Sequence, residues 1–137
     1  MKKIIRLLAL ALVTVMVCLS LASCGGPNSD PDKALEALKS NGIEWAAKDD
    51  TVTPALLKAF NVDGVECVVS GTGKIDDEFA LITIIYFESA EAASESMKGT
   101  EDYADERKSR VDESKWVFEQ SGKMIYFGHK DAIKAAQ

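Results

Sequence analysis

The chain has 137 residues, with 16 Lys or Arg against 22 Asp or Glu, and its formal net charge at pH 7 is −6. This acidic balance disfavours nucleic acid as a partner and disfavours electrostatic attraction to anionic membranes or wall polymers. The length predicts one domain that buries roughly 60–70% of its unfolded surface, which is enough for a core without a metal ion or disulfide bond. No cofactor is expected.

The first 23 residues have the pattern of an export signal. Met1–Arg6 carries three cations and no acid, and Leu7–Leu19 is apolar apart from Thr14. Small residues follow the apolar run. The run is shorter than the roughly 20 apolar residues that a membrane-spanning helix needs. A cleaved signal peptide is therefore favoured over a permanent helix.

This signal ends in Leu21-Ala22-Ser23-Cys24, an aliphatic residue, two small residues and a cysteine. The stretch resembles the lipobox of bacterial lipoproteins, and the resemblance covers residues 1–24. It implies that the Cys24 thiol takes a diacylglyceryl group and that cleavage falls between Ser23 and Cys24. The alternative is an ordinary signal peptide in which the cysteine is incidental. An anchor of two or three acyl chains would hold the domain firmly, since each buried CH₂ contributes about 0.8 kcal/mol.

The lipobox divides the chain into a signal peptide at 1–23, a lipidated tether at 24–30 and a single domain at 31–137. The tether is rich in Gly, Pro and small polar residues and reaches only ~20 Å when fully extended. Removing 23 residues and three of the 16 cations leaves 114 residues with 13 cations against 22 acids, a net charge of −9.

The first part of the domain predicts two helices and a strand. Asp30-Pro31-Asp32 has the acidic N-cap and the early proline of a helix start, and Asn41-Gly42 has the glycine of a helix end. Ile43–Ala47 alternates apolar and polar residues as a short strand does. Thr53-Pro54 predicts a second helix start, and this brief helix is expected to end at Phe60.

The centre of the chain predicts a pair of strands. Val65–Val69 alternates in the manner of a strand, with Cys67 on its apolar face. Gly71–Glu78 is predicted to be a polar loop. Phe79–Phe87 is apolar on both faces, which predicts a central strand covered on both sides, or on one side and partly on the other.

A helical region is expected after the central strand. Ser89 is placed to cap a helix that runs through Met97. Gly99-Thr100 is predicted to interrupt this helix, and Thr100 to cap a second segment. That segment passes from acidic residues to the basic group Arg107–Arg110, as the helix dipole prefers.

The last third predicts a hairpin and a closing helix. Trp116–Phe118 and Met124–Phe127 are the expected strands, joined by a tight turn at Gln120–Lys123. Lys130–Ala136 is expected to close the chain as a short helix.

The predicted order is α-β-α-β-β-α-β-β-α. Its hairpins favour a mostly antiparallel sheet of about five strands, in an α+β two-layer sandwich with the helices packed on one face. The element order, together with the ending Ser121–Gly128, is similar to that of small uncharacterised bacterial lipoproteins. This likeness implies no particular activity and no site residues.

Two residues could carry nucleophilic chemistry. His129 is the single histidine and is predicted to support the start of the last helix. Cys67 shares a face with Val65 and Val69, so burial is favoured over reactivity. A cysteine hydrolase would need Cys67 beside His129, and the sequence leaves that open. With one histidine, a nitrogen–sulfur metal site is not expected.

Carboxylates and aromatic residues are further candidates. Paired acids could bind Ca²⁺ or act as in glycosidases, but on solvated loops and helix faces they more often keep a domain soluble. The acid groups are Asp49-Asp50, Asp76-Asp77-Glu78, Glu101-Asp102 and Asp105-Glu106. Four aromatic residues could line a ligand groove, although their spacing favours core or half-exposed sheet positions: Trp45, Tyr103, Trp116 and Tyr126.

We therefore expect a non-enzymatic domain, lipid-anchored to the cell membrane through Cys24 and facing outside the cytoplasm, either at the outer surface or in the periplasm. Its partner is an unidentified protein or small molecule. Two alternatives stay open. One is a small envelope hydrolase that uses carboxylates or Cys67 with His129. The other is a structural or stress-related envelope accessory protein.

Overall fold

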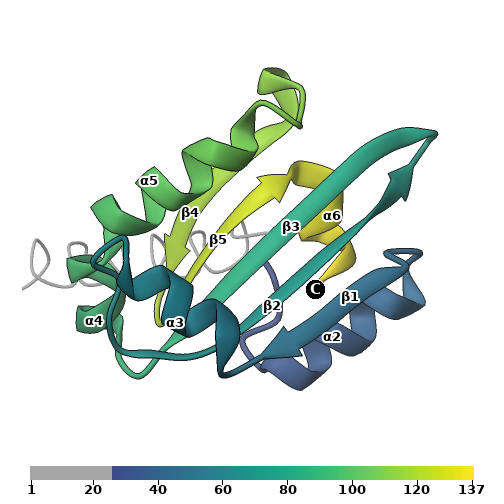
Figure 1. Ribbon diagram of the computed structural model, residues 1–137. Coiled ribbons are helices and arrows are strands. Elements are labelled where there is room, and N and C mark those ends of the chain that lie inside the picture. Colours follow the sequence, from purple (N-terminus) through teal and green to yellow (C-terminus); the bar gives the residue numbers. More distant parts are fainter. Residues whose placement is uncertain (1–25) are drawn as a thin grey trace, which may run out of the picture.

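The computed structural model describes residues 26–137. The elements in chain order are α2 (Pro31–Ser40), β1 (Trp45–Asp49), α3 (Val52–Lys58), β2 (Val65–Ile75), β3 (Glu78–Phe87), α4 (Ala90–Glu95), α5 (Met97–Lys108), the 3₁₀ helix η1 (Glu113–Lys115), β4 (Trp116–Ser121), β5 (Met124–His129) and α6 (Lys130–Ala135). The strands form one antiparallel sheet in the order β1-β2-β3-β5-β4 (Figure 1). The predicted α+β class and antiparallel sheet are confirmed.

Helices lie against both faces of the sheet, whereas the sequence prediction placed them on one. Ile84 and Tyr126 pack with α2 and α6 on one face. Ile85 and Phe127 pack with α3, α4 and α5 on the other. The reason is that β3 and β5 carry apolar residues at successive positions, so each face of these strands needs its own helical cover.

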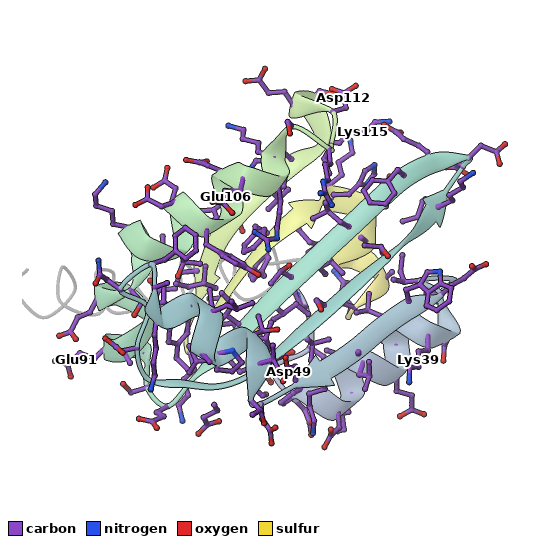
Figure 2. All side chains as sticks on the ribbon, viewed as in Figure 1. Lys39, Asp49, Glu91, Glu106, Asp112 and Lys115 are labelled. Carbon is purple, nitrogen blue, oxygen red and sulfur yellow. The ribbon has the colours of Figure 1, made fainter. Side chains whose placement is uncertain are left out.

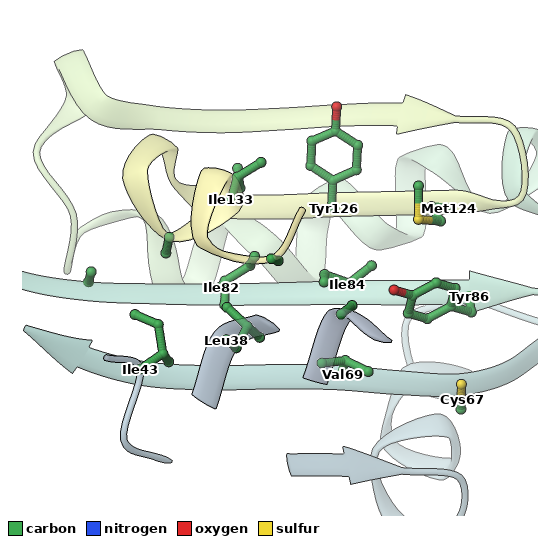
Figure 3. Close-up of a cluster of buried hydrophobic side chains, with 14 residues drawn as sticks. Leu38, Ile43, Cys67, Val69, Ile82, Ile84, Tyr86, Met124, Tyr126 and Ile133 are labelled. Carbon is green, nitrogen blue, oxygen red and sulfur yellow. The ribbon is translucent and has the colours of Figure 1, made fainter. Parts of the chain in front are cut away.

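The cluster on the α2 and α6 face forms the rigid side of the sheet. Leu38 of α2 and Ile133 of α6 belong to one cluster with Ile82, Ile84 and Tyr86 of β3, and Figure 3 shows Leu38 beside Ile82. All five side chains are buried. The two helices thus cover the middle of this face, and a hollow remains at its edge beside Tyr86 and Met124.

Among the described residues, packing against the domain already includes Pro27, before the predicted domain boundary at residue 31. Pro27 is buried. The backbone N–H of Asn28 donates to the carbonyl oxygen of Ala136 at 2.8 Å, and the Tyr86 hydroxyl donates to the carbonyl oxygen of Asn28 at 2.7 Å. Burial raises the pKa of Tyr86 well above its usual range, so this hydroxyl stays a donor.

The predicted polar loop at Gly71–Glu78 is instead the end of a long β2–β3 hairpin. β2 continues to Ile75, and β3 starts at Glu78. The turn consists of Asp76 and Asp77, whose φ angles are 52° and 64°. Aspartate tolerates this left-handed region better than most residues do, and two such residues form a tight hairpin turn.

The predicted Ser89 cap is confirmed, but the break in the following helix lies earlier than expected. The Ser89 hydroxyl accepts a hydrogen bond from a backbone N–H of α4. The break falls at Ser96, which ends α4 and precedes α5, and not at Gly99-Thr100. Gly99 lies inside α5, and the glycine there allows the close approach of Phe60, whose carbonyl oxygen a Cβ atom would overlap.

Candidate functional site

The helices leave part of the α3, α4 and α5 face of the sheet open. Residues paired across β1, β2 and β3 share a face of the sheet. Two such cross-strand rows lie on the open part: Trp45, Thr72 and Leu81 in one, and Ala47, Ser70 and Thr83 in the other.

A groove of about 230 Å³ lies over these rows, between α3 and α5. We call it the sheet groove. Its floor includes Ser70, Thr72, Leu81 and Thr83, and its walls include Thr53, Tyr103, Arg107, Arg110 and Trp45. Drug-sized ligands occupy pockets of roughly 300–1,000 Å³, so the sheet groove fits a small molecule or one end of a larger one. Among residues 26–137, no Asp or Glu lines the groove.

Arg107 is held in place by Tyr103, one turn earlier in α5. Its guanidinium carbon lies 3.8 Å from the centre of the Tyr103 ring, and Nη1 donates to the Tyr103 carbonyl oxygen at 3.0 Å. Nη1 also lies 3.8 Å from Oε2 of Glu106. A guanidinium has five N–H donors, so these contacts orient the group and leave donors available.

Hydroxyl groups form the polar part of the floor. Thr83 is buried, and Ser70 and Thr72 flank it on β2. Within residues 26–137, none of these three hydroxyls has a hydrogen-bond partner. Burial raises the pKa of Tyr103, with Arg107 acting in the opposite direction, so the phenol is neutral at pH 7. The three hydroxyls of the floor and the Tyr103 phenol of the wall are therefore neutral hydrogen-bonding groups.

Trp45 stands at the rim of the groove with 77% of its surface exposed. It also borders a neighbouring hollow of about 400 Å³, together with Phe79 and Lys74. Phe79 is 40% exposed. Two large aromatic side chains that a folded domain would normally bury thus lie at the open end of the sheet.

The predicted lipobox residues Leu21, Ala22, Ser23 and Cys24 lie outside the described residues. Within the described part of the chain, no helix is long and apolar enough to cross a membrane.

Cys67 is buried beside Val69, as predicted, and burial raises the pKa of its thiol. Val65 packs on the opposite face instead, because a bulge between Val65 and Cys67 shifts the register. Cys67 pairs with Tyr86 at one end of β3.

His129 lies toward the other end of β3, away from Cys67. The residue before it, Gly128, pairs with Ile82. Cys67 pairs with Tyr86. Ile82 and Tyr86 are four positions apart on β3, so their Cα atoms are separated by roughly 14 Å along the strand. The structure does not bring Cys67 and His129 together.

His129 caps α6, as the sequence predicts. Its Nδ1 accepts a hydrogen bond from the backbone N–H of Asp131 at 3.1 Å. The side chain is buried, and its Nε2 has no hydrogen-bond partner among residues 26–137. Oε2 of Glu78 lies 3.8 Å from Nε2, but that carboxylate pairs with Lys115.

Two of the four predicted acid groups have local structural roles, and the other two, Glu101-Asp102 and Asp105-Glu106, are exposed on α5. The Asp49 carboxylate caps the start of α3 by accepting hydrogen bonds from the backbone N–H groups of Thr51, Val52 and Thr53. These hydrogen bonds lower the pKa of Asp49 to about 2, and the bond from the Thr51 N–H has the largest effect. Asp76 and Asp77 form the hairpin turn described above. In the region that the structure covers, no three His, Cys, Asp or Glu side chains are grouped to hold a metal ion.

The four predicted aromatic residues divide into two pairs. Trp45 and Tyr103 line the sheet groove. Trp116 packs 5.7 Å from the Phe127 ring, and the Tyr126 hydroxyl donates to Glu119. Sequence reasoning treated the basic end of α5 as a helix-dipole feature only. It therefore missed Arg107 and Arg110 as groove residues, and their three-residue spacing was the one available signal.

Comparison with known proteins finds no match: no protein-family model, no curated protein and no solved structure resembles the chain.

Proposed function

We propose that the chain is a lipid-anchored domain outside the cytoplasm that binds its ligand in the sheet groove. The observation that carries this proposal is an open groove with two arginine side chains and no carboxylate on a strongly acidic domain. Its floor is a sheet whose other face is packed against α2 and α6. A site on such a rigid floor loses little entropy when it binds.

The anchoring part of the proposal rests on the signal pattern and on the place where packing begins. Only Gly25 and Gly26 separate Cys24 from the buried Pro27. Three residue steps span at most ~10 Å. A lipid on Cys24 would therefore hold the domain directly against the membrane, with little freedom to swing away.

Changing Cys24 to alanine is expected to abolish incorporation of a fatty-acid probe and to leave residues 1–23 attached. The reason is that the lipobox cysteine supplies the thiol that is acylated before cleavage. Metabolic labelling and intact mass measure the two effects. The matched control is Cys18→Ala, which lies in the apolar run and should label normally. Equal labelling of the Cys24→Ala and native chains would contradict the lipid anchor.

Ligand binding in the sheet groove can be tested with a variant whose larger side chain occupies the groove. A thermal-shift panel of sugars, amino acids, organic acids, nucleotides and fatty acids is run on the native protein and on Thr72→Trp, which places an indole at the centre of the floor. A ligand at 100 times its Kd stabilises a protein by about 2.7 kcal/mol. We expect at least one compound class to raise the Tm of the native protein and not that of Thr72→Trp.

Thr72→Val is the control, because it keeps the shape of the groove and removes one hydroxyl. It should keep most of the response. If no compound class stabilises the native protein, or if Thr72→Trp responds equally, the groove is not the binding site.

A further inference from the structure

The sheet groove carries two arginine side chains, so its charge has the opposite sign to the net charge of the protein. The chain carries 22 acidic and 16 basic residues, yet the groove holds two cations and no acid. A concave surface with one sign of charge concentrates its field on a ligand of the opposite sign. The charge of the groove is thus complementary to an anion, although the net charge of the chain is negative.

The helix dipole explains part of this arrangement but not all of it. Any cationic side chain in the last turn of α5 interacts favourably with the helix dipole, whether or not the side chain faces the groove. Arg107, Lys108 and Arg110 all lie at this end of the helix, but Lys108 does not line the groove and both arginines do. The side chains that face the groove are those with a planar fork of donors, which matches carboxylate and phosphate oxygens.

Arg107 is oriented before any ligand arrives. The Tyr103 ring and the Tyr103 carbonyl oxygen fix its guanidinium. Arg110 is exposed and forms no ion pair with any residue of the described range. One arginine is thus fixed and the other is free to close over a bound group.

The remaining contacts suit the body of an organic molecule. Trp45 offers an exposed aromatic face at the rim, and Leu81 offers an apolar patch in the same cross-strand row. Between them, the Thr72 hydroxyl can donate or accept a hydrogen bond. The arginines can therefore contact an anionic group of a ligand, and Trp45 and Leu81 can contact a flat or apolar part of the same molecule.

We propose that the sheet groove binds a small organic acid, whose carboxylate or phosphate group is held by Arg107 and Arg110 and whose body lies against Trp45 and Leu81. This rests on the binding function proposed above and adds the chemical class of the ligand.

The test uses four probes on the purified protein: benzoate, phenyl phosphate, the neutral benzamide and inorganic phosphate. Binding is followed by chemical-shift titration. We expect benzoate or phenyl phosphate to bind at least tenfold more tightly than benzamide, with shifts at Thr72 and Leu81. The stronger of the two identifies carboxylate or phosphate as the preferred group. Trp45→Ala should weaken the aromatic acids and leave inorganic phosphate unchanged.

The double variant Arg107→Ala/Arg110→Ala should weaken binding of the preferred acid at least tenfold. Its matched control is Lys98→Ala/Lys108→Ala, which removes the same charge from exposed positions of α5 outside the groove and should change affinity less than threefold. Because Arg107 also packs on Tyr103, Arg110→Ala and Arg107→Lys are measured alone, and each should weaken binding in a folded protein.

Equal binding of benzamide and benzoate, or equal losses in the arginine and lysine double variants, would overturn the assignment of an anion. Absence of binding by all four probes would overturn it too. The thermal-shift panel described above tests the binding function separately from the anion assignment. If a neutral compound stabilises the native protein and not Thr72→Trp, the groove binds a ligand although that ligand is not an acid.

Discussion

Replacing Gly128 with alanine is expected to lower the free energy of unfolding by about 3–5 kcal/mol, from backbone strain of roughly 1–3 kcal/mol and overpacking of a similar size. Gly128 has a φ of +136°, which L side chains rarely adopt. A Cβ atom there would overlap the carbonyl oxygen of Leu81 and would lie 2.9 Å from Cα of Ile82. Both contacts are with the backbone of β3, which has no rotamer by which to move aside.

Gly122 provides the control. It also has a positive φ, +57°, but no atom lies within 4 Å of a Cβ built on it. Gly122→Ala should therefore cost only the left-handed backbone penalty, about 1–2 kcal/mol. Urea unfolding followed by circular dichroism measures both variants. If Gly128→Ala were no more destabilised than Gly122→Ala, β3 and β5 would not approach as closely as described.

The fold could be predicted from the sequence where local chemistry decides the structure. The acidic cap with Pro31, the Ser89 cap and the apolar Phe79–Phe87 run each specify their element through contacts within a few residues. Gly99 shows where this reasoning fails. It resembles a helix break in the sequence, but it lies inside α5. A glycine fits this position because the backbone of Phe60, 39 positions away, leaves no room for a side chain. Such a packing constraint has no local signature.

The polar end of β2 shows the same limit for the sheet. Thr72 and Lys74 are polar residues of the kind found in loops. The solvent-exposed face of a strand carries the same kinds of residue, so the sequence does not distinguish the two structures. Only the pairing with β1 and β3 distinguishes the two. Because the open face begins at these residues, misassigning them also concealed the floor of the groove.

The candidate site could be predicted only in parts. The sequence predicts His129 as a support for the start of the last helix, and it offers Trp45 and Tyr103 among four possible groove residues while favouring core or half-exposed positions for them. What the sequence could not provide was the meeting of β1, β2, β3 and the end of α5 in space. Arg107 and Thr72 are 35 positions apart in the sequence, yet both line the sheet groove. Figure 2 shows acidic side chains such as Asp49, Glu106 and Asp112 on the surrounding surface.

Ile84→Ala is the second change with a large expected effect, a loss of about 2–5 kcal/mol in the free energy of unfolding. Ile84 is fully buried at the middle of β3, where it pairs with Val69 on one side and Tyr126 on the other. α2 and α6 cover it from above. Neither neighbouring strand can move inward without breaking its ladder, so the cavity left by the side chain would stay open.

Val52→Ala is the matched control, because it also removes methyl groups from a β-branched side chain, but at a position with 63% of its surface exposed. Its expected effect is within about 0.5 kcal/mol. With urea m-values of about 1–3 kcal/mol/M, the loss at Ile84 would lower the unfolding midpoint by at least about 0.7 M. An Ile84→Ala midpoint equal to that of Val52→Ala would mean that β3 is not the centre of the sheet. The floor of the groove would then have no rigid layer beneath it, since Ile84 lies on the closed face of the strand whose open face carries Leu81 and Thr83.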